Sequence, residues 1–235
     1  MNAGQQAAAE PQFDRSGWWD PACRAFRSLR SVSTFRLELL HRWLPGSWRR
    51  RLVVDLGCGG GLLGVPLAAA GATVVGVDLA RTALQAAAQR AQAGFLPVAG
   101  DLGATPIADH SADLVLLADV LEHVADPAAV VAGAGRLLRP GGHLFVNTIH
   151  RTLQSRLFAI TLGEGLGFIP RGTHRWRQFV TPTELDSSAQ RAHLRLVRRT
   201  GERPLLGATL RQGAVVLRES RSLAVGYAAL YRSLP

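Results

Sequence analysis

Residues 53–61 read Val53-Val-Asp-Leu-Gly-Cys-Gly-Gly-Gly61, and this stretch decides the fold. A short β-branched run that enters alternating glycines predicts a buried strand, a tight turn and a helix that begins near Leu62. Glycine lets backbone approach a ligand closely, and a helix N-terminus offers free N–H groups and a partial positive charge. A second apolar run, Val74-Val-Gly-Val-Asp78, ends in a carboxylate that can bind both hydroxyls of a ribose. The sequence therefore predicts a nucleoside site.

The spacing of the glycines distinguishes between nucleoside cofactors. Gly57, Gly59 and Gly61 follow the pattern G-x-G-x-G, whereas dinucleotide sites favour G-x-G-x-x-G beneath a pyrophosphate. Asp55 lies two residues before the first glycine, where its carboxylate can orient the turn and reach a ligand's ammonium through backbone or water. This arrangement suits the amino-acid end of S-adenosylmethionine and disfavours a nicotinamide-dependent oxidoreductase.

The composition indicates one globular domain with additions, because the chain has 235 residues of which 47% are hydrophobic. No apolar run reaches the ~18–20 residues that span a bilayer. The first residues are polar and resemble no secretory signal, so we expect a disordered N-terminus. The two cysteines, Cys23 and Cys58, do not indicate a disulfide framework. A reducing, cytoplasmic location fits this usage.

The chain is strongly basic, with a net charge of +10, and all 27 of its cationic residues are arginine. A GC-rich codon supply explains the arginine bias, but basic proteins also attract nucleic acid and anionic lipid. The arginines are spread along the chain, and no basic strip with interleaved aromatic residues occurs. We therefore expect no nucleic-acid partner.

Apolar runs and helical patterns alternate through the middle of the chain. We predict strands at 52–56, 73–77, 95–98, 112–117 and 143–148, and helices at 61–70, 81–92 and 127–138. Such alternation predicts an α/β fold with a doubly wound parallel sheet. A capping box, Thr181-Pro-Thr-Glu184, opens a later helix, and 193–198 and 222–231 are expected to close one edge as an antiparallel pair.

These patterns divide the chain into five segments. They are a disordered N-terminus (1–12), an amphipathic helical cap (13–50), a nucleoside-binding core (51–150), a lid or substrate segment (151–180), and a C-terminal helix with closing strands (181–235). The lid combines apolar residues with arginines, which suits a greasy substrate at an anionic membrane surface. A lid whose apolar face only covers the site is the alternative.

Further candidate residues follow the third and fourth strands, where ligands bind in such sheets. Asp101 can accept from the exocyclic amine of adenine while the Leu102 N–H donates to the ring; a simple Asx turn is the alternative. Asp119, Glu122 and His123 share one face if a helical turn begins there. They could bind a hard divalent cation or supply a general base, or the turn could only cap the strand.

Two histidines, His150 and His174, flank an irregular part of the chain in the region expected to cover the site. Each is a candidate for proton transfer or substrate contact, although a histidine in a loop is usually only solvated.

Several motifs together resemble the class I S-adenosylmethionine-dependent methyltransferases. The resemblance extends to the ubiquinone-biosynthesis O-methyltransferases (the polyprenyl-dihydroxyphenol and demethylubiquinol 3-O-methylases). It rests on 54–61, 77–78, Leu121-Glu-His-Val-Ala-Asp-Pro127 and Leu138-Arg-Pro-Gly-Gly142, and on the more specific blocks Trp18-Trp-Asp-Pro21 and Pro170-Arg-Gly-Thr-His174.

The resemblance implies a Rossmann-like, mostly parallel sheet with an antiparallel edge strand and a helical N-terminal cap. It implies cofactor contacts from Arg36, Gly57, Asp78 and Ala118, and divalent-metal ligands, such as for Mg²⁺, at Asp119, Glu122 and His123. The chain departs from the family pattern around the acceptor: Asp119 replaces a usual Glu, His150 replaces a usual Asn, and Arg30, Ser33 and Gly226 also differ.

We therefore expect O-methylation of a phenol or catechol, specifically a polyprenylated quinone precursor, with the small phenolic or quinol substrate taken at the inner face of a membrane. An O- or N-methyltransferase of a soluble secondary metabolite is the main alternative. A nucleic-acid methyltransferase lacks its base-flipping motif here, and a binding module without catalysis leaves so complete a cofactor site unexplained.

Overall fold

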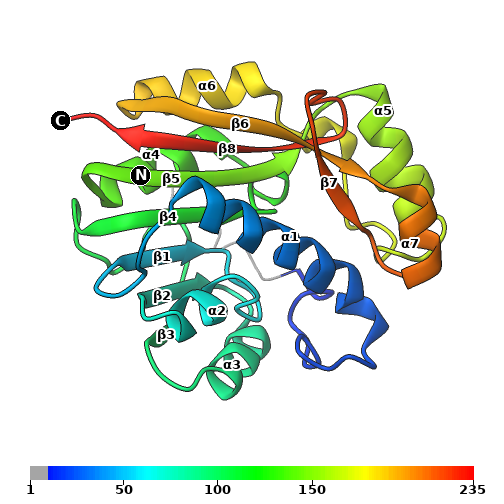
Figure 1. Ribbon diagram of the computed structural model, residues 1–235, viewed down its shortest axis with the longest axis horizontal. Helices are drawn as coiled ribbons and strands as arrows, with labels where there is room; N and C mark the ends of the chain where they lie inside the picture. The colour runs from blue at the N-terminus through cyan, green and yellow to red at the C-terminus, as the bar shows by residue number, and fades with distance from the viewer. Residues whose placement is uncertain (1–9) are drawn as a thin grey trace, which may run out of the picture.

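A central sheet with helices on both faces forms the body of the molecule (Figure 1), for which a computed structural model describes residues 10–235. Eight strands lie in the order β3-β2-β1-β4-β5-β8-β6-β7. The first five are parallel, and the last three are antiparallel to their neighbours. This confirms the mostly parallel, doubly wound sheet. The strands are β1 (Leu52–Leu56), β2 (Thr73–Asp78), β3 (Phe95–Ala99), β4 (Ala112–Ala118), β5 (Leu138–Ile149), β6 (Leu194–Pro204), β7 (Leu217–Ser220) and β8 (Gly226–Ser233).

Two apolar cores fix the helices against the sheet. One face packs on α4 (Pro127–Leu137) and α6 (Pro182–Arg191), and the other on α1 (Arg27–Trp43), α2 (Gly64–Ala69) and α3 (Arg81–Arg90). The capping box predicted for α6 is present, with Thr181 and Glu184 each accepting from the other's backbone N–H. Because β1, β2 and β4 are parallel neighbours, their carboxyl ends meet at one edge of the sheet.

The N-terminal segment is less helical than predicted. Residues 13–23 form turns, and only η1 (Arg24–Phe26) and α1 are helical. Gly17 has a positive φ of 89°, and Pro21 disfavours helical backbone at the residue before it. Of the segment expected to be disordered (1–12), residues 1–9 lie outside the described part, whereas Glu10 and Gln12 are placed beside the site described below.

The lid and the sheet edge contain elements that the sequence pattern did not reveal. The lid holds α5 (Leu153–Ser155), a π-helix η3 (Arg156–Glu164) and η4 (Trp176–Gln178). Between β6 and β7 lies α7 (Leu206–Gln212), and Figure 1 places it beside α5 and β7 at one end of the molecule. Within residues 10–235, no helix has the length and apolar character needed to traverse a bilayer.

Candidate active site

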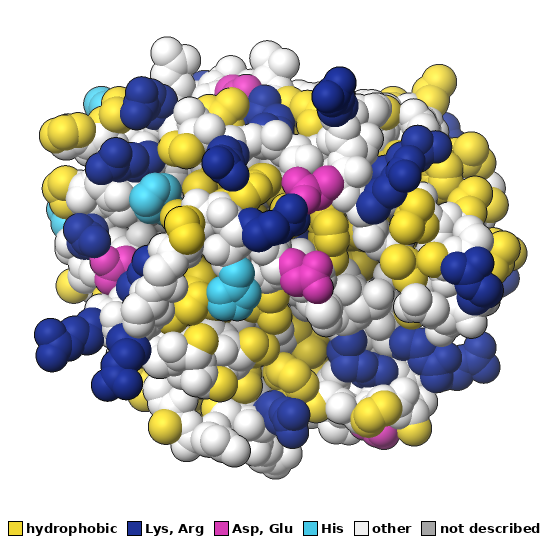
Figure 2. All heavy atoms as spheres, in the orientation of Figure 1, with side chains coloured by type: hydrophobic (Ala, Val, Ile, Leu, Met, Phe, Trp, Pro, Cys, Tyr) yellow, Lys and Arg dark blue, Asp and Glu magenta, His cyan; other side chains and the backbone are white. Residues whose placement is uncertain are grey.

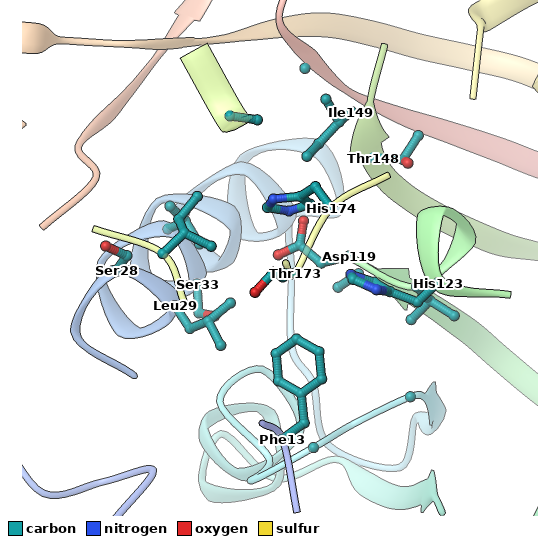
Figure 3. A pocket seen from close by; sticks show the side chains of 18 of the residues that line it. Phe13, Ser28, Leu29, Ser33, Asp119, His123, Thr148, Ile149, Thr173 and His174 are labelled. Atoms are coloured by element: carbon teal, nitrogen blue, oxygen red, sulfur yellow. The ribbon is translucent and has the colours of Figure 1, made fainter. Parts of the chain in front are cut away.

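A cavity of about 830 Å³ opens at the carboxyl ends of β1, β2 and β4. The glycine turn and Asp78 line one side of it, and the lid, α1 and α7 line the other. Figure 3 shows Phe13 approaching from the N-terminal segment, while Asp119, His123 and His174 lie near one another on the opposite wall. Segments distant in sequence therefore meet around one space.

The glycine turn is tied to the end of β2. The amides of Gly57 and Cys58 both donate to the carbonyl of Val77, at 2.8 and 3.1 Å. Gly57 has a φ of 73°, and a Cβ there would lie 2.6 Å from a methyl of Val120. Only glycine satisfies both the backbone conformation and the space at this position.

The tryptophan block of the N-terminal segment packs on the same turn. The Trp19 indole N–H donates to the carbonyl of Gly60 at 2.8 Å, and Trp18 stacks on Phe26 with ring centroids 4.2 Å apart. A Cβ on Gly60 would lie only 2.3 Å from Trp18 Cγ. The N-terminal block and the glycine turn thus form a single packed unit, which explains structurally why both motifs occur together.

Asp78, the carboxylate predicted to bind the ribose, lies at the end of β2. Its Oδ2 accepts from the Gly59 amide at 2.7 Å and its Oδ1 from the Ala80 amide at 2.8 Å. A carboxylate offers about four acceptor positions, so capacity for two hydroxyls remains. Burial raises the pKa of Asp78, although its hydrogen bonds with backbone amides act against this. The orientation of the carboxylate is set before any ligand arrives.

The remaining predicted cofactor residues line the cavity: Asp55, Gly57, Gly59, Asp101, Leu102 and Ala118. Asp55 is buried beneath the turn, where it accepts from the Gly64 amide, and burial raises its pKa to about 7. Asp101 accepts from the Gly103 amide at 2.7 Å, so the Asx turn considered above is present at a residue that also faces the cavity.

Arg36 reaches the cavity from α1, but its guanidinium is held by two carboxylates. It donates to both oxygens of Asp119, one of them at 3.0 Å, and to Glu202 Oε2 at 3.1 Å. Arg36 and Glu202 are buried. Burial alone would lower the pKa of Arg36, but the charges of Asp119 and Glu202 raise it above its ordinary value. A cofactor carboxylate at Arg36 would have to share it with these two partners.

The metal ligands implied by the family resemblance do not assemble here. The Asp119 carboxylate accepts from Arg36 and from the side-chain amide of Asn147, the latter at 3.0 Å. Glu122, in η2 (Leu121–His123), is buried and accepts from Thr148 Oγ1 at 2.7 Å. Across residues 10–235, no three His, Cys, Asp or Glu side chains are grouped to hold a metal ion. As placed, these residues do not fit a divalent cation.

The three candidate histidines have different surroundings. His123 Nδ1 lies 3.5 Å from Glu10 Oε2, and the centroid of the His123 ring is 6.0 Å from that of the His174 ring. His174 Nδ1 lies 3.1 Å from Glu164 Oε1. Both histidines line the cavity. His150 does not: its Nδ1 lies 3.0 Å from the carbonyl of Leu223, and its ring packs on Tyr227.

The sequence patterns do not point to two acidic residues, Glu164 and Glu202, whose partners line the cavity. Glu164 is the only acid between Asp126 and Glu184, and Glu202 is the only one between Asp186 and Glu219. An isolated acid within a long basic stretch was the available signal. Their partners, His174 and Arg36, could not be paired with them from sequence alone.

Comparison with known proteins shows which family the chain is similar to. Residues 54–146 match the family model described as "Methyltransferase domain". The chain is 40% identical to a ubiquinone biosynthesis O-methyltransferase of Ralstonia nicotianae over 75% of each chain. It is 34% identical to the enzyme of that name from Marinobacter nauticus, over 97% of this chain and 94% of that one.

Solved structures support the fold. A methyltransferase of Thermotoga maritima, described as a possible histamine N-methyltransferase, has a TM-score of 0.67 at 20% identity, over 94% of this chain and 98% of its own. Magnesium protoporphyrin IX methyltransferase from Synechocystis, with bound S-adenosylhomocysteine, has a TM-score of 0.63 at 20% identity, over 89% and 85% of the two chains. At this identity the likeness concerns the fold alone.

Proposed function

Because the chain belongs to the ubiquinone biosynthesis O-methyltransferase family of S-adenosylmethionine-dependent enzymes, we propose that it methylates a phenolic oxygen of a polyprenylated quinone precursor. One observation carries the proposal. A single cavity joins the glycine turn and Asp78 to a histidine, His174, and to an apolar wall. A methyl donor, a proton acceptor and a greasy tail would each have a place in it.

The donor end follows from the residues of the turn. Asp78 would bind the ribose hydroxyls, and Asp101 and Leu102 would bind the adenine. The backbone of Gly57 and Gly59 lets the amino-acid end approach closely. When bound, S-adenosylmethionine supplies a methyl group that its sulfonium already makes electrophilic. The protein's contribution is to align the acceptor oxygen with that methyl and to exclude water, an effect worth up to ~7–11 kcal/mol in favourable cases.

His174 is the histidine best placed to take the phenolic proton. Burial, and then the charge of His123, lower its pKa, so the neutral form that accepts a proton predominates at neutral pH. Burial also acts to lower the pKa of His123, but Glu10, Glu122 and Asp119 outweigh it and raise that pKa. His123 is therefore better suited to stabilising negative charge on the acceptor, and His150 lies outside the cavity lining.

The acceptor end of the cavity is apolar. Its walls come from α1, the π-helix η3 with the turn that follows it, and α7, and they include Leu29, Phe158, Leu162, Ile169, Leu206 and Leu210. Side chains of this type bury a prenyl chain at about 25 cal/mol per Å² of apolar surface removed from water. A soluble, polar acceptor would gain nothing from these walls.

Contact with an anionic membrane is a further part of the proposal. Leu166 and Leu210, which line the cavity, are 59% and 64% exposed, and Leu153 in α5 of the lid is 75% exposed. Figure 2 shows hydrophobic and basic side chains intermingled at the end of the molecule where Figure 1 places α5 and α7. Flotation with anionic vesicles tests this: we expect the protein to float, and protein that stays in solution contradicts it.

Magnesium dependence remains a prediction of the family resemblance, and the roles proposed for Asp78 and His174 do not involve a metal ion. Binding a cation would require Asp119 to leave Arg36. Turnover with and without EDTA tests the metal, and a Glu122→Gln variant tests the ligand: loss of activity in both supports the implied site, and full activity in both refutes it.

The acceptor class is tested by comparing turnover of two catechols that differ only in a prenyl chain. We expect the prenylated catechol to have a kcat/KM at least about tenfold higher, because its tail is buried. Equal values for the two would favour a soluble metabolite as the natural acceptor.

A further inference from the structure

Glu164 is a buried carboxylate at the end of η3, in a stretch of chain that otherwise carries only arginines as charged residues. It is 7% exposed, yet its ion-pairing partner is not an arginine. Burying a carboxylate is costly unless hydrogen bonds replace water. The hydrogen-bond partners of Glu164 therefore indicate its role.

Three N–H groups surround the carboxylate, and two of them belong to one histidine. Oε2 accepts from the Gly172 amide at 2.7 Å, Oε1 accepts from the His174 amide at 2.9 Å, and the same Oε1 lies 3.1 Å from His174 Nδ1. An ionised carboxylate can only accept, so Nδ1 must carry a hydrogen. In the neutral ring, the lone pair is then on Nε2.

The other edge of the His174 ring belongs to the cavity. His174 lines it beside Thr173 and Asp119, as Figure 3 shows. Within residues 10–235 Nε2 makes no hydrogen bond, and it is not among the buried atoms left without a partner. The nitrogen with the lone pair is therefore the one left for a ligand.

We propose that Glu164 is a positioning residue that fixes the tautomer and direction of His174 for methyl transfer. The inference rests on the function proposed above. The phenolic proton moves to His174 Nε2 while the oxygen forms a bond to the methyl carbon. The carbon–sulfur bond breaks, and its electron pair stays on sulfur as a thioether. Glu164 stabilises the resulting imidazolium without taking the proton, which later leaves to solvent.

A role that is only structural must be separated from this one, because Glu164 also holds the loop through the Gly172 amide. The variant is Glu164→Gln, which keeps the shape of the side chain but removes the negative charge that stabilises the imidazolium. Glu184→Gln is the matched control: Glu184 also accepts from backbone, at the start of α6, and does not line the cavity.

Two acceptors distinguish the roles: catechol, whose proton must be removed, and nitrocatechol, which is already ionised near neutral pH. We expect Glu164→Gln to lower kcat with catechol by about 10²–10⁴-fold. The fold-decrease in kcat with nitrocatechol should be at least about tenfold smaller. The affinity of Glu164→Gln for S-adenosylhomocysteine should equal that of wild type. The Glu184→Gln control should have the wild-type kcat with both acceptors. An equal loss with both acceptors, or no loss, overturns the proposal.

Imidazole ¹⁵N NMR gives a readout that does not need turnover. Wild-type His174, assigned by its absence in His174→Gln, should show a protonated Nδ1 and an unprotonated Nε2, and this preference should be lost in Glu164→Leu, which has no oxygen to accept from Nδ1. The same tautomer in both proteins overturns the role of Glu164. If wild type methylates neither acceptor, the proposed function fails, whereas the NMR result still decides the positioning role.

Discussion

The indole of Trp18 lies directly against Gly60, so that a Cβ on Gly60 would meet Trp18 Cγ at 2.3 Å. The tryptophan is itself buried and stacked on Phe26, so it cannot swing aside without opening the packing beneath α1. The N-terminal segment therefore constrains the glycine turn directly, although the two are about 40 residues apart in the chain.

Substituting Gly60 with alanine should therefore weaken cofactor binding. The added methyl forces either the turn or Trp18 to move, and overpacking of this kind costs about 1–3 kcal/mol. We expect a lower Tm and an S-adenosylhomocysteine affinity reduced at least about tenfold, measured by calorimetry. Gly133→Ala in α4 is the control, because a Cβ there meets nothing within 4 Å. Equal affinities in Gly60→Ala and wild type would contradict this account of the turn.

Removing the carboxylate of Asp78 should weaken binding of the methyl donor and leave binding of the methyl acceptor unchanged. Asp78→Ala loses the acceptor for the ribose and also the two amide hydrogen bonds that orient the turn. Charge-assisted hydrogen bonds contribute about 1.5–3 kcal/mol each, so we expect an affinity for S-adenosylhomocysteine at least about 100-fold lower. Asp101→Ala should cause a smaller loss, since Asp101 is engaged in its own Asx turn. A larger loss in Asp101→Ala would reverse the assignment.

The buried charges at Arg36 give a prediction for stability. Arg36→Met leaves Asp119 and Glu202 without their cation, and breaking a buried pair from one side costs about 3–5 kcal/mol. Urea denaturation should show this decrease in the free energy of unfolding. Adding Glu202→Gln to Arg36→Met should restore part of it, because one uncompensated charge is removed. No recovery in the double variant would mean that the carboxylates are not paired as described.

Asp55 gives a prediction for pH. Burial raises its pKa from 3.8 to about 7, so between these values the folded protein holds a proton that the unfolded chain has lost. The contribution of Asp55 to stability is therefore fully present below pH ~4, falls as pH rises towards ~7, and then levels off. The isosteric Asp55→Asn has no such titration. Its stability relative to wild type should increase between pH 5 and 8, by on the order of a few kcal/mol; a constant difference would contradict this.

Local patterns in the sequence were enough to predict the sheet. The first five strands and α3 and α4 lie within a few residues of their predicted bounds, except that β5 begins earlier, because apolar runs and glycine stops are local signals. The short α7 and the four-residue β7 lack such a signal, and their partly exposed faces show no clear periodicity. The segment that joins them is held by a long-range contact, in which the Ser28 hydroxyl accepts from the Val215 amide at 3.1 Å.

The same contrast between local patterns and long-range contacts applies to the candidate site. The residues expected to hold the methyl donor could be placed together from sequence because Gly57, Gly59 and Asp78 lie in two short motifs at the ends of neighbouring strands. The acceptor half depends on pairs that only folding creates, such as Glu202 with Arg36 across 166 residues. The same pairing explains why Asp119 faces a guanidinium here, which the spacing of Asp119, Glu122 and His123 could not reveal.

The most direct test follows the methyl group itself. Purified protein is incubated with S-adenosylmethionine labelled in its methyl carbon and with a prenylated catechol, and the product is analysed by mass spectrometry and NMR. We predict that the label appears as a methyl ether on one phenolic oxygen, with one S-adenosylhomocysteine formed per ether. Label on carbon or nitrogen, or no labelled product from any phenol while the donor binds, would contradict the account.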